Sequence, residues 1–593
     1  MRRAATLTGV LALAGVAAGS ARWPVAPASV ADSLNAAFGR GVPLTWSEPQ
    51  RATFSALPWP SLRVIDARLD SASGANLVSA PEARIDLSLV QLVLGRVAPA
   101  RLTLAAPTLT LDLDQQPFMA RLGAADAMVA ISRFAPLESV GVTDGVVRIM
   151  SRKHGLDTVI EGVRGRYSGF SPASRVGIDI SAVWRDAPLI VSASLDKPGR
   201  AAAGTPSALN LTVVSSLGDL AFSGVVKGGV SPVAAGDFAV SSHALGAAAR
   251  LFGAALPPAL DARDLSVSGR IKASPQDAVL DEATITSGGQ SLQGALRLAR
   301  GGGRLSISGS LDADHLSLSP LLGPSEHLRA RNGGWSKRPF AMPLPLNVDL
   351  DLRLSAGQLD AYGVILDNVA ASALLKDGAL TANLVEANTY GGRGVGELKL
   401  ISDNSNPGLA VRGKLVGADL GAAGSALGLA ALTGKGDIDL AVKTGGRSPA
   451  ELVSGLQGTA SLALAEGAVS GVNLEEALRR SQRRPLDVTK DMRSGGTTFD
   501  RATVDLVIDE GVAHVVKGAL LARGLKADLE GDVDLGDQAW RLRLNVAQAE
   551  PDGAPAPDAA RLSLDIDGPW SDPTVQPVGE PDETEAGPPE PTP

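Results

Sequence analysis

The sequence contains no cysteine among its 593 residues, which excludes disulfide bonds, thiolate metal sites and cysteine nucleophiles. Aromatic residues make up only 3%, whereas a transmembrane barrel carries aromatic girdles at both membrane interfaces. Basic residues are outnumbered, with 55 Lys and Arg against 63 Asp and Glu and a net charge of −8. The chain therefore lacks the positive surplus that displaces counterions from nucleic acids, and we expect no nucleic-acid partner.

Catalytic patterns are also missing. No two of the five histidines lie within metal-ligand spacing of each other, and we find no nucleophile elbow, phosphate loop or paired-carboxylate motif. The run from Gly392 to Gly396 reads G-R-G-V-G, but it lacks the full phosphate-loop spacing and lies between strand-like segments. We therefore expect no enzyme, no catalytic residue, no cofactor and no metal site.

What the sequence does contain is alternation of apolar and polar residues, which is clearest between residues 81 and 114. This period of two is typical of β-strands with one wet face and one apolar face. The pattern recurs for hundreds of residues, so it predicts a long sheet whose apolar face is the working surface. The candidate residues of that face are Ile85, Leu87, Leu89, Leu102, Leu104, Leu109 and Leu111.

A few segments read as helices between the strands. Ser29–Phe38 is expected to be helical with Ser29 as N-cap, before a first strand at Leu62–Ile65. Gly123–Phe134 and Ser242–Gly253 are further helix candidates. Ser448 and Pro449 have the signature of an N-cap followed by a first helical residue, and Thr459–Arg480 reads as strand, turn and helix.

The N-terminal segment has two interpretations. Arg2 and Arg3 precede an uncharged stretch from Ala4 to Ala21, which fits an uncleaved membrane anchor with the arginines in the cytoplasm. Small residues at positions 18–21 also fit a cleaved signal peptide. The remaining predicted divisions are a β-rich region at 29–325, an irregular linker at 326–345, a second β-rich region at 346–577 and a disordered acidic tail at 578–593.

One basic cluster lies near residue 480, and it comprises Arg479, Arg480, Arg483, Arg484, Lys490 and Arg493. Such a cluster is typical of a solvated helix end, where cations interact well with the carbonyl dipole. The alternative is contact with phosphate headgroups or with an anionic partner protein.

Several segments, taken in their order along the chain, resemble the AsmA family of bacterial envelope proteins. They lie in the N-terminal block and its first strands, and then at Trp335–Ser336, Thr389–Gly392, Leu456–Leu474, Thr497–Phe499 and Asp567–Pro573. Residues 190–300 share only the general strand-like pattern with the family. The N-terminal hydrophobic stretch is less hydrophobic than a typical membrane anchor.

The resemblance implies a mostly β fold with an elongated, curved antiparallel sheet that forms a groove, a few short helices and an N-terminal hydrophobic helix. It implies an inner-membrane anchor, a body in the periplasm, and phospholipid or lipopolysaccharide-type lipids along the groove, with Ile85 to Leu111 as groove candidates. Outer-membrane assembly proteins are the expected protein partners. Two alternatives stay open, namely a periplasmic scaffold of β-sandwiches that holds no lipid and a secreted β-rich adhesin.

Overall fold

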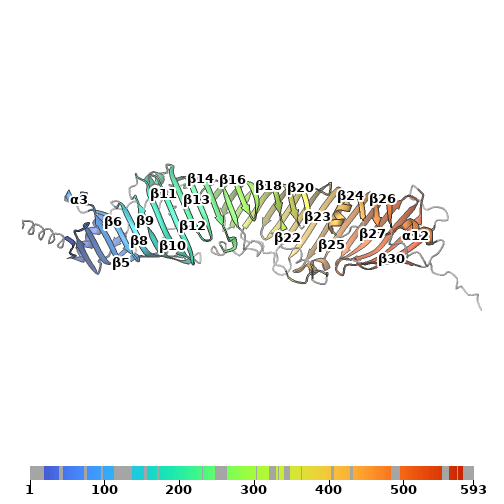
Figure 1. The fold of residues 1–593 in the computed structure, drawn as a ribbon, viewed down its shortest axis with the longest axis horizontal. Coiled ribbons are helices and arrows are strands. Elements are labelled where there is room, and N and C mark those ends of the chain that lie inside the picture. The colour runs from blue at the N-terminus through green and yellow to red at the C-terminus, as the bar shows by residue number, and fades with distance from the viewer. Residues whose placement is uncertain are drawn as a thin grey trace, which may run out of the picture. The chain divides into compact units, whose positions relative to one another are not determined.

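The protein is described by a computed structural model (Figure 1). The described residues run from 19 to 578, except for gaps at 39–43, 72–75, 95–97, 113–136, 152–155, 170–172, 230, 248–263, 302–303, 320–328, 331–332, 340–347, 362, 402–406, 428–431, 482–494, 551–559 and 571. The predicted helix at Gly123–Phe134, most of the predicted N-terminal segment and most of the acidic tail lie outside the described residues, and these predictions remain open.

The chain divides into two compact units. Unit 1 comprises Met1–Leu256 and Asp261–Gly288, and unit 2 comprises Pro257–Leu260 and Gly289–Pro593. The division at residues 326–345 stays a prediction. Both units are mostly β, as predicted, and in each of them the strands lie side by side almost in chain order (Figure 1).

In the described part of the chain, the strands form one numbered series from β1 to β31, and unit 1 contains β1 to β16. They are β1 (Trp23–Val25), β2 (Leu44–Trp46), β3 (Arg51–Ser55), β4 (Ser61–Ser71), β5 (Asn76–Leu87), β6 (Pro99–Ala105), β7 (Thr108–Asp112), β8 (Ser139–Ser151), β9 (Leu156–Ser168), β10 (Val176–Trp184), β11 (Ala187–Leu195), β12 (Ser207–Ser215), β13 (Gly218–Lys227), β14 (Val233–Ser242), β15 (Leu265–Ala273) and β16 (Asp277–Ser287).

Unit 2 contains the rest of that series. They are β17 (Gln290–Gly301), β18 (Arg304–Ser317), β19 (Val348–Ala361), β20 (Val364–Lys376), β21 (Ala379–Thr389), β22 (Gly392–Ile401), β23 (Gly408–Asp419), β24 (Leu432–Gly445), β25 (Gln457–Ser470), β26 (Gly496–Asp509), β27 (Val512–Ala522), β28 (Leu525–Asp534), β29 (Ala539–Gln548), β30 (Arg561–Pro569) and β31 (Thr574–Val578).

The sheets are mixed, which corrects the prediction of a purely antiparallel arrangement. In unit 1, β8 runs parallel to both β6 and β7, and in unit 2, β19 runs parallel to β18 from Val348 to Asp360. Parallel neighbours need a long crossover because the chain must return to the starting edge of the sheet. Both parallel joins follow a long connection, whereas short turns join most of the antiparallel pairs.

Short helices interrupt the strands, as predicted. Within the described ranges, the labelled helices are α2 (Pro27–Phe38), α3 (Leu89–Val93) and α6 (Pro198–Ala202) in unit 1, and α10 (Leu420–Leu427), α11 (Pro449–Ser454) and α12 (Leu474–Ser481) in unit 2. Among the described residues, no helix combines the length and the apolar character that a bilayer crossing requires.

Three local predictions need correction. Helix α2 begins at Pro27, so Ser29 lies inside its first turn and is not the N-cap, because proline is already suited to the first helical position. Strands β1 to β3 precede the strand predicted to be the first, and that strand extends over β4. The third correction concerns Leu89, which belongs to α3: the Ser88 side chain accepts a hydrogen bond from the Gln91 amide and ends the strand at Leu87.

Other local predictions are confirmed. The Ser448 side chain caps α11 by accepting a hydrogen bond from the amide of Glu451 at 3.3 Å, with Pro449 in the first turn. The predicted strand, turn and helix at Thr459–Arg480 correspond to β25 and α12. In the segment predicted as a helix from Ser242, Ser242 ends β14, and the described residues 245–247 are helical.

Candidate functional site

The candidate site is an apolar face over β10–β14 of unit 1, which we call the open face. Its residues alternate along each strand with exposed neighbours, and all except Phe222 are half-buried. Phe222, at 9% exposure, is at the limit of burial. The open face consists of Ile180, Val191, Ala193, Leu211, Val213, Leu220, Phe222, Phe238 and Val240.

The strand register aligns these side chains in rows across the sheet. One row passes from Ile180 through Val191 and Val213 to Leu220 and Val240. A second row places Ala193, Leu211, Phe222 and Phe238 opposite one another. Directly opposed residues of paired strands point to the same face, so both rows form one continuous apolar surface.

The first row continues beyond β14. Val240 is opposite Val267 of β15, and Val267 is opposite Ile285 of β16; both residues are half-buried. At a strand spacing of roughly 4.8 Å, a row from β10 to β16 is about 30 Å long. One leaflet of a bilayer has about half of that hydrocarbon thickness, so the row is long enough for an extended acyl chain.

Little covers the open face within the described part of unit 1. A small buried cluster of Val176, Leu195 and Ala201 brings α6 against one edge, where it also contacts Ile178 and Leu209. The open-face residues belong to no buried cluster. The described strands of this unit form no second sheet that could pack on them.

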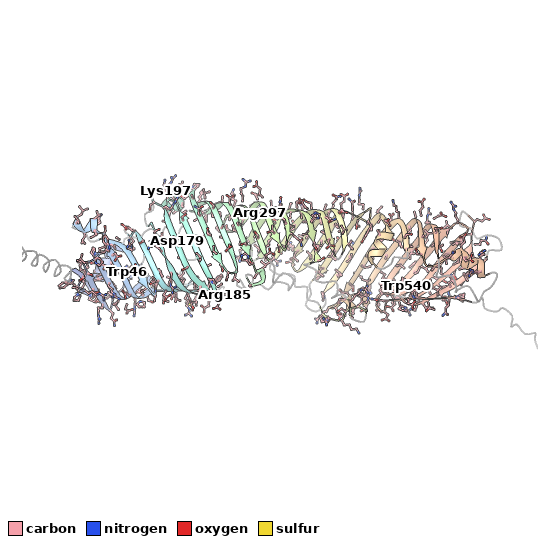
Figure 2. All side chains as sticks on the ribbon, in the orientation of Figure 1. Trp46, Asp179, Arg185, Lys197, Arg297 and Trp540 are labelled. Carbon is pink, nitrogen blue, oxygen red and sulfur yellow. The ribbon has the colours of Figure 1, made fainter. Side chains whose placement is uncertain are left out.

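The opposite face of the same strands is largely polar. Asp179 lies between Ile178 and Ile180 on β10 and is exposed on this face, while Arg185 and Lys197 lie beyond opposite ends of the strands, after β10 and β11 (Figure 2). Some aliphatic residues also lie on the polar face, with Ile190 at 52% exposure and Val214 and Val225 at 42% and 44%. They provide matched exposed positions for substitution.

A hollow lies against the same region. Its volume is about 760 Å³, and its lining comes from β12 to β16. The lining includes Leu211, Phe222 and Phe238, but most of its residues, such as Asn210, Ser223 and Asp237, belong to the polar face by the strand register. The hollow therefore does not mark a ligand site on the open face.

The residues predicted from the sequence lie elsewhere in unit 1. Ile85 and Leu102 are opposite each other on β5 and β6 and belong to the same buried cluster as Val30 and Leu34 of α2. Leu87, Leu104, Leu109 and Leu111 are half-buried on neighbouring strands, and Leu89 is exposed on α3. The structure therefore places two of these residues in a helix-covered core. The open face was missed as a candidate, although its alternation is visible at 176–180 and 209–213 and no long helical segment interrupts it.

Unit 2 contains a contrasting region in which helices cover the apolar face. Leu420 and Ala423 of α10 and Leu474 and Leu478 of α12 belong to one buried cluster with residues of β25–β30. We call this the covered cluster; its strand residues are Ala418 of β23 and, on β25–β30, Leu464, Phe499, Ala502, Ala522, Leu525, Ala527, Val546, Leu562 and Leu564. Leu564 is fully buried and Leu525 is 2% exposed.

The residues that hold the start of α12 in place belong to the sequence segments that resemble the AsmA family. The Asn473 side chain accepts a hydrogen bond from the Glu476 amide at 2.9 Å. Thr497 Oγ1 accepts one from the Leu474 amide at 2.9 Å and donates to the Val472 carbonyl at 2.6 Å. A Cβ at Gly467 would collide with the Thr433 carbonyl oxygen and with the Phe499 ring, so a side chain has no room at this position.

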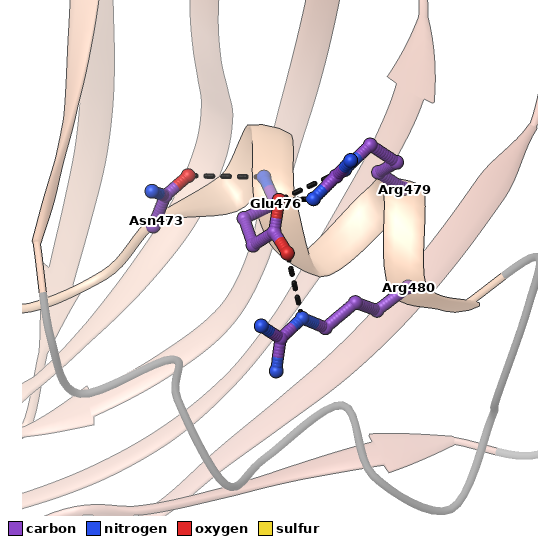
Figure 3. Close-up of polar contacts among 4 residues, drawn as sticks. All are labelled: Asn473, Glu476, Arg479 and Arg480. Carbon is purple, nitrogen blue, oxygen red and sulfur yellow. Dashed lines mark hydrogen bonds and ion pairs between the residues drawn. The ribbon is translucent and has the colours of Figure 1, made fainter.

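Two members of the basic cluster are described, and both are paired. Arg479 and Arg480 donate to opposite oxygens of the Glu476 carboxylate from the next turn of α12 (Figure 3). Both hydrogen bonds lower the pKa of Glu476, with the one from Arg480 contributing most. This pairing fits a solvated helix end. The other members of the cluster lie outside the described residues.

The segment around Trp335 is fixed to one edge of unit 2. Trp335 Nε1 donates to the Leu535 carbonyl at 2.7 Å, and the Ser336 carbonyl accepts from the Ala450 amide at 3.0 Å. The guanidinium of Arg329 lies over the Trp335 ring at 5.6 Å. Residues between β18 and β19 thus reach α11 and the turn after β28, which explains the Trp-Ser pair noted in the sequence.

Charged groups elsewhere have structural partners. Arg304 at the start of β18 pairs with Asp349 of β19, and this hydrogen bond lowers the pKa of the Asp349 carboxyl.

Burial raises the pKa of Tyr167, on β9 beside the open face, to about 12. Within the described ranges, no group of three or more His, Asp or Glu side chains could hold a metal ion.

Comparison with known proteins gives one family. No curated protein matches the chain. Residues 309–517, from within β18 to within β27 of unit 2, match the model of the AsmA family. This confirms the resemblance seen in the sequence, and this part of the chain belongs to the AsmA family.

Proposed function

We propose that the protein binds phospholipid acyl chains on the open face of unit 1 and serves as a lipid carrier in the bacterial cell envelope. The observation that carries this proposal is the continuous apolar surface of β10–β14. Its side chains other than Phe222 remain half-buried, and no described helix covers it beyond α6 at one end of the strands. AsmA-family membership of residues 309–517 supports the assignment to the envelope.

The physical argument is the cost of an uncovered apolar surface. Exposure of apolar area to water is unfavourable by roughly 25 cal/mol per Å², and large contiguous apolar patches mark binding sites. Hydrocarbon chains are suitable occupants because they need no directed hydrogen bonds. A row about 30 Å long with polar residues on the reverse face fits an extended chain, while the headgroup stays in water.

The proposed setting follows from the sequence. The uncharged stretch Ala4–Ala21 serves as a single inner-membrane anchor, and the body lies in the periplasm. Phospholipid or lipopolysaccharide-type lipids are the proposed ligands, and outer-membrane assembly proteins are the proposed protein partners. In this role the protein is a carrier that supports outer-membrane assembly and lipid homeostasis, without a catalytic step.

A photo-crosslinking experiment tests the proposal. The full chain is incubated with a phospholipid that carries a photoreactive group at the end of one acyl chain, and the crosslinked peptides are identified by mass spectrometry. We expect crosslinks to peptides of β12 and β13. The double variant Leu211→Asp/Phe222→Asp should reduce them at least about fivefold, because a buried carboxylate disfavours hydrocarbon contact.

The matched control carries the same charges on the reverse face of the same strands. Val214→Asp/Val225→Asp changes exposed positions and should leave the crosslinks unchanged. Crosslinks that are absent from β12 and β13, or equal in both double variants, would overturn the proposal and leave a scaffold that holds no lipid. Circular dichroism of each variant separates loss of lipid from loss of fold.

A further inference from the structure

Unit 1 has a second apolar surface, distinct from the open face, at one corner of its first strands. Helix α3 has no buried residue, and Val93 and Val90 are 86% and 70% exposed. Exposed indoles of Trp23 and Trp59 lie on neighbouring segments. We call this the apolar corner; its members are Trp23, Leu57, Trp59, Leu89, Val90, Leu92, Val93 and Leu94.

Backbone contacts hold these segments at the same end of the sheet. Trp23 of β1 pairs with Phe54, near the end of β3. The Pro60 carbonyl accepts a hydrogen bond from the Leu87 amide at 2.8 Å, which places the loop with Leu57 and Trp59 beside the start of α3. The exposed groups of these three chain segments therefore lie at the same end of the neighbouring strands β1, β3, β4 and β5.

The uncharged N-terminal stretch ends at that point. The Gly19 carbonyl accepts hydrogen bonds from the amides of Ala56 and Leu57, at 3.0 and 2.7 Å. A Cβ at Gly19 would collide with the Leu57 side chain, so the two residues are in close contact. Gly19 belongs to the stretch Ala4–Ala21, and the chain thus leaves this stretch in the middle of the apolar corner.

The residue types of the apolar corner indicate what kind of surface it contacts. Gln91 is the only polar residue of α3, so the helix is apolar on nearly every side. Tryptophan and aliphatic side chains next to the end of a hydrophobic segment are typical of the membrane interface, where indoles sit at headgroup level. We propose that the apolar corner docks on a phospholipid bilayer and fixes the orientation of unit 1 against the membrane surface.

This inference rests on the proposed membrane attachment but is independent of lipid carriage on the open face. The absence of cysteine allows a single dye to be placed at one position. The full chains of Val93→Cys and Ile190→Cys are labelled with an environment-sensitive fluorophore and reconstituted in vesicles of phosphatidylethanolamine and phosphatidylglycerol. Ile190 is the matched control, since it is 52% exposed on the polar face of unit 1.

We expect a blue shift and a severalfold intensity increase at position 93, with quenching by spin-labelled lipids, and neither change at position 190. Adding Val90→Asp to the Val93→Cys chain should abolish the quenching while the protein still floats with the vesicles through its N-terminal stretch. Equal spectra at positions 93 and 190 would overturn the proposal. Energy transfer between labelled copies without vesicles would also overturn it, because a second copy would then be the occupant.

The docking and carrier proposals can fail separately. Val90→Asp should leave the acyl-chain crosslinks to β12 and β13 unchanged, and Leu211→Asp/Phe222→Asp should leave the spectrum at position 93 unchanged. Loss of both signals in either variant would show that the two surfaces do not act independently and would contradict the assignment of the apolar corner as a separate surface.

Discussion

The open face of unit 1 and the covered cluster of unit 2 are built from the same kind of alternating strand, yet their apolar residues differ in burial. Leu211 and Phe238 are half-buried, whereas Leu564 is fully buried and Leu525 is 2% exposed. The difference lies in the connections. Helices α10 and α12 are inserted between strands of unit 2 and contribute Leu420, Leu474 and Leu478 to the cluster, while α6 reaches only the edge of the open face.

The comparison shows that alternation decides which face of a sheet is apolar, and connections decide whether that face becomes a core. A core residue is enclosed on all sides, so its truncation costs the protein both the transfer free energy of the removed atoms and the packing around them. A half-buried residue keeps access to solvent or ligand. The two regions should therefore respond differently to the same chemical change.

The largest difference is expected in thiol accessibility. Leu211→Cys on the open face should react readily with a maleimide, and Leu564→Cys should react at least about a hundredfold more slowly, because its labelling requires local opening. Labelling rates measured by mass spectrometry check this, and the absence of native cysteine removes background. Added phospholipid should slow only the Leu211→Cys reaction. Equal rates at the two positions would remove the distinction between the regions.

Truncating one leucine to alanine in each region should lower the free energy of unfolding by different amounts. Leu564→Ala should destabilise its unit by about 3 kcal/mol through the cavity that it leaves, whereas Leu211→Ala should cost about 1 kcal/mol because the side chain is only partly removed from water. Urea unfolding followed by hydrogen exchange of peptides from β30 and β12 measures each effect locally. A larger loss for Leu211→Ala would mean that the open face is enclosed after all.

Ionisation provides a further test at the edge of the open face. Burial raises the pKa of Tyr167 from 10.0 to about 12, so the fold favours the neutral phenol. That contribution is fully present below pH 10 and is lost as the pH rises through about 12. Tyr167→Phe should therefore lose less stability over this interval, by about 1–2 kcal/mol. Unfolding midpoints of both chains at pH 10 and 12 measure the difference, and parallel changes would contradict it.

The smallest expected effect concerns the Trp335 segment at the edge of unit 2. Trp335→Phe removes the hydrogen bond to the Leu535 carbonyl and should cost about 1 kcal/mol. Hydrogen exchange should become faster at the Ala450 amide, which donates to the neighbouring Ser336 carbonyl, and should not change on β12. Faster exchange on β12 as well would indicate a general loss of stability instead of a local contact.

Much of the fold could be predicted from the sequence, because strand alternation and helix capping are local. The Ser448 cap and the strand–helix pair at Thr459–Arg480 needed no distant contact. The parallel joins could not be predicted, since pairing of β18 with β19 depends on where the crossover returns. Leu89 was misassigned because the cap at Ser88 overrides the alternation. The choice of Ile85 and Leu102 as groove residues stays a prediction. The helix at Ser29–Phe38 was expected, but the cluster that its Val30 and Leu34 share with Ile85 and Leu102 joins distant segments of the chain and could not be read from alternation.

Because little encloses the open face, its positions should also differ from the covered cluster in how readily they accept substitutions. Most side chains of the open face are only half-buried, so aliphatic substitutions there should cost less than the same substitutions in the covered cluster. Gly467 beside Phe499, by contrast, admits no larger residue. We therefore expect substitutions to be tolerated more readily along β10–β14 than around Gly467 beside α12.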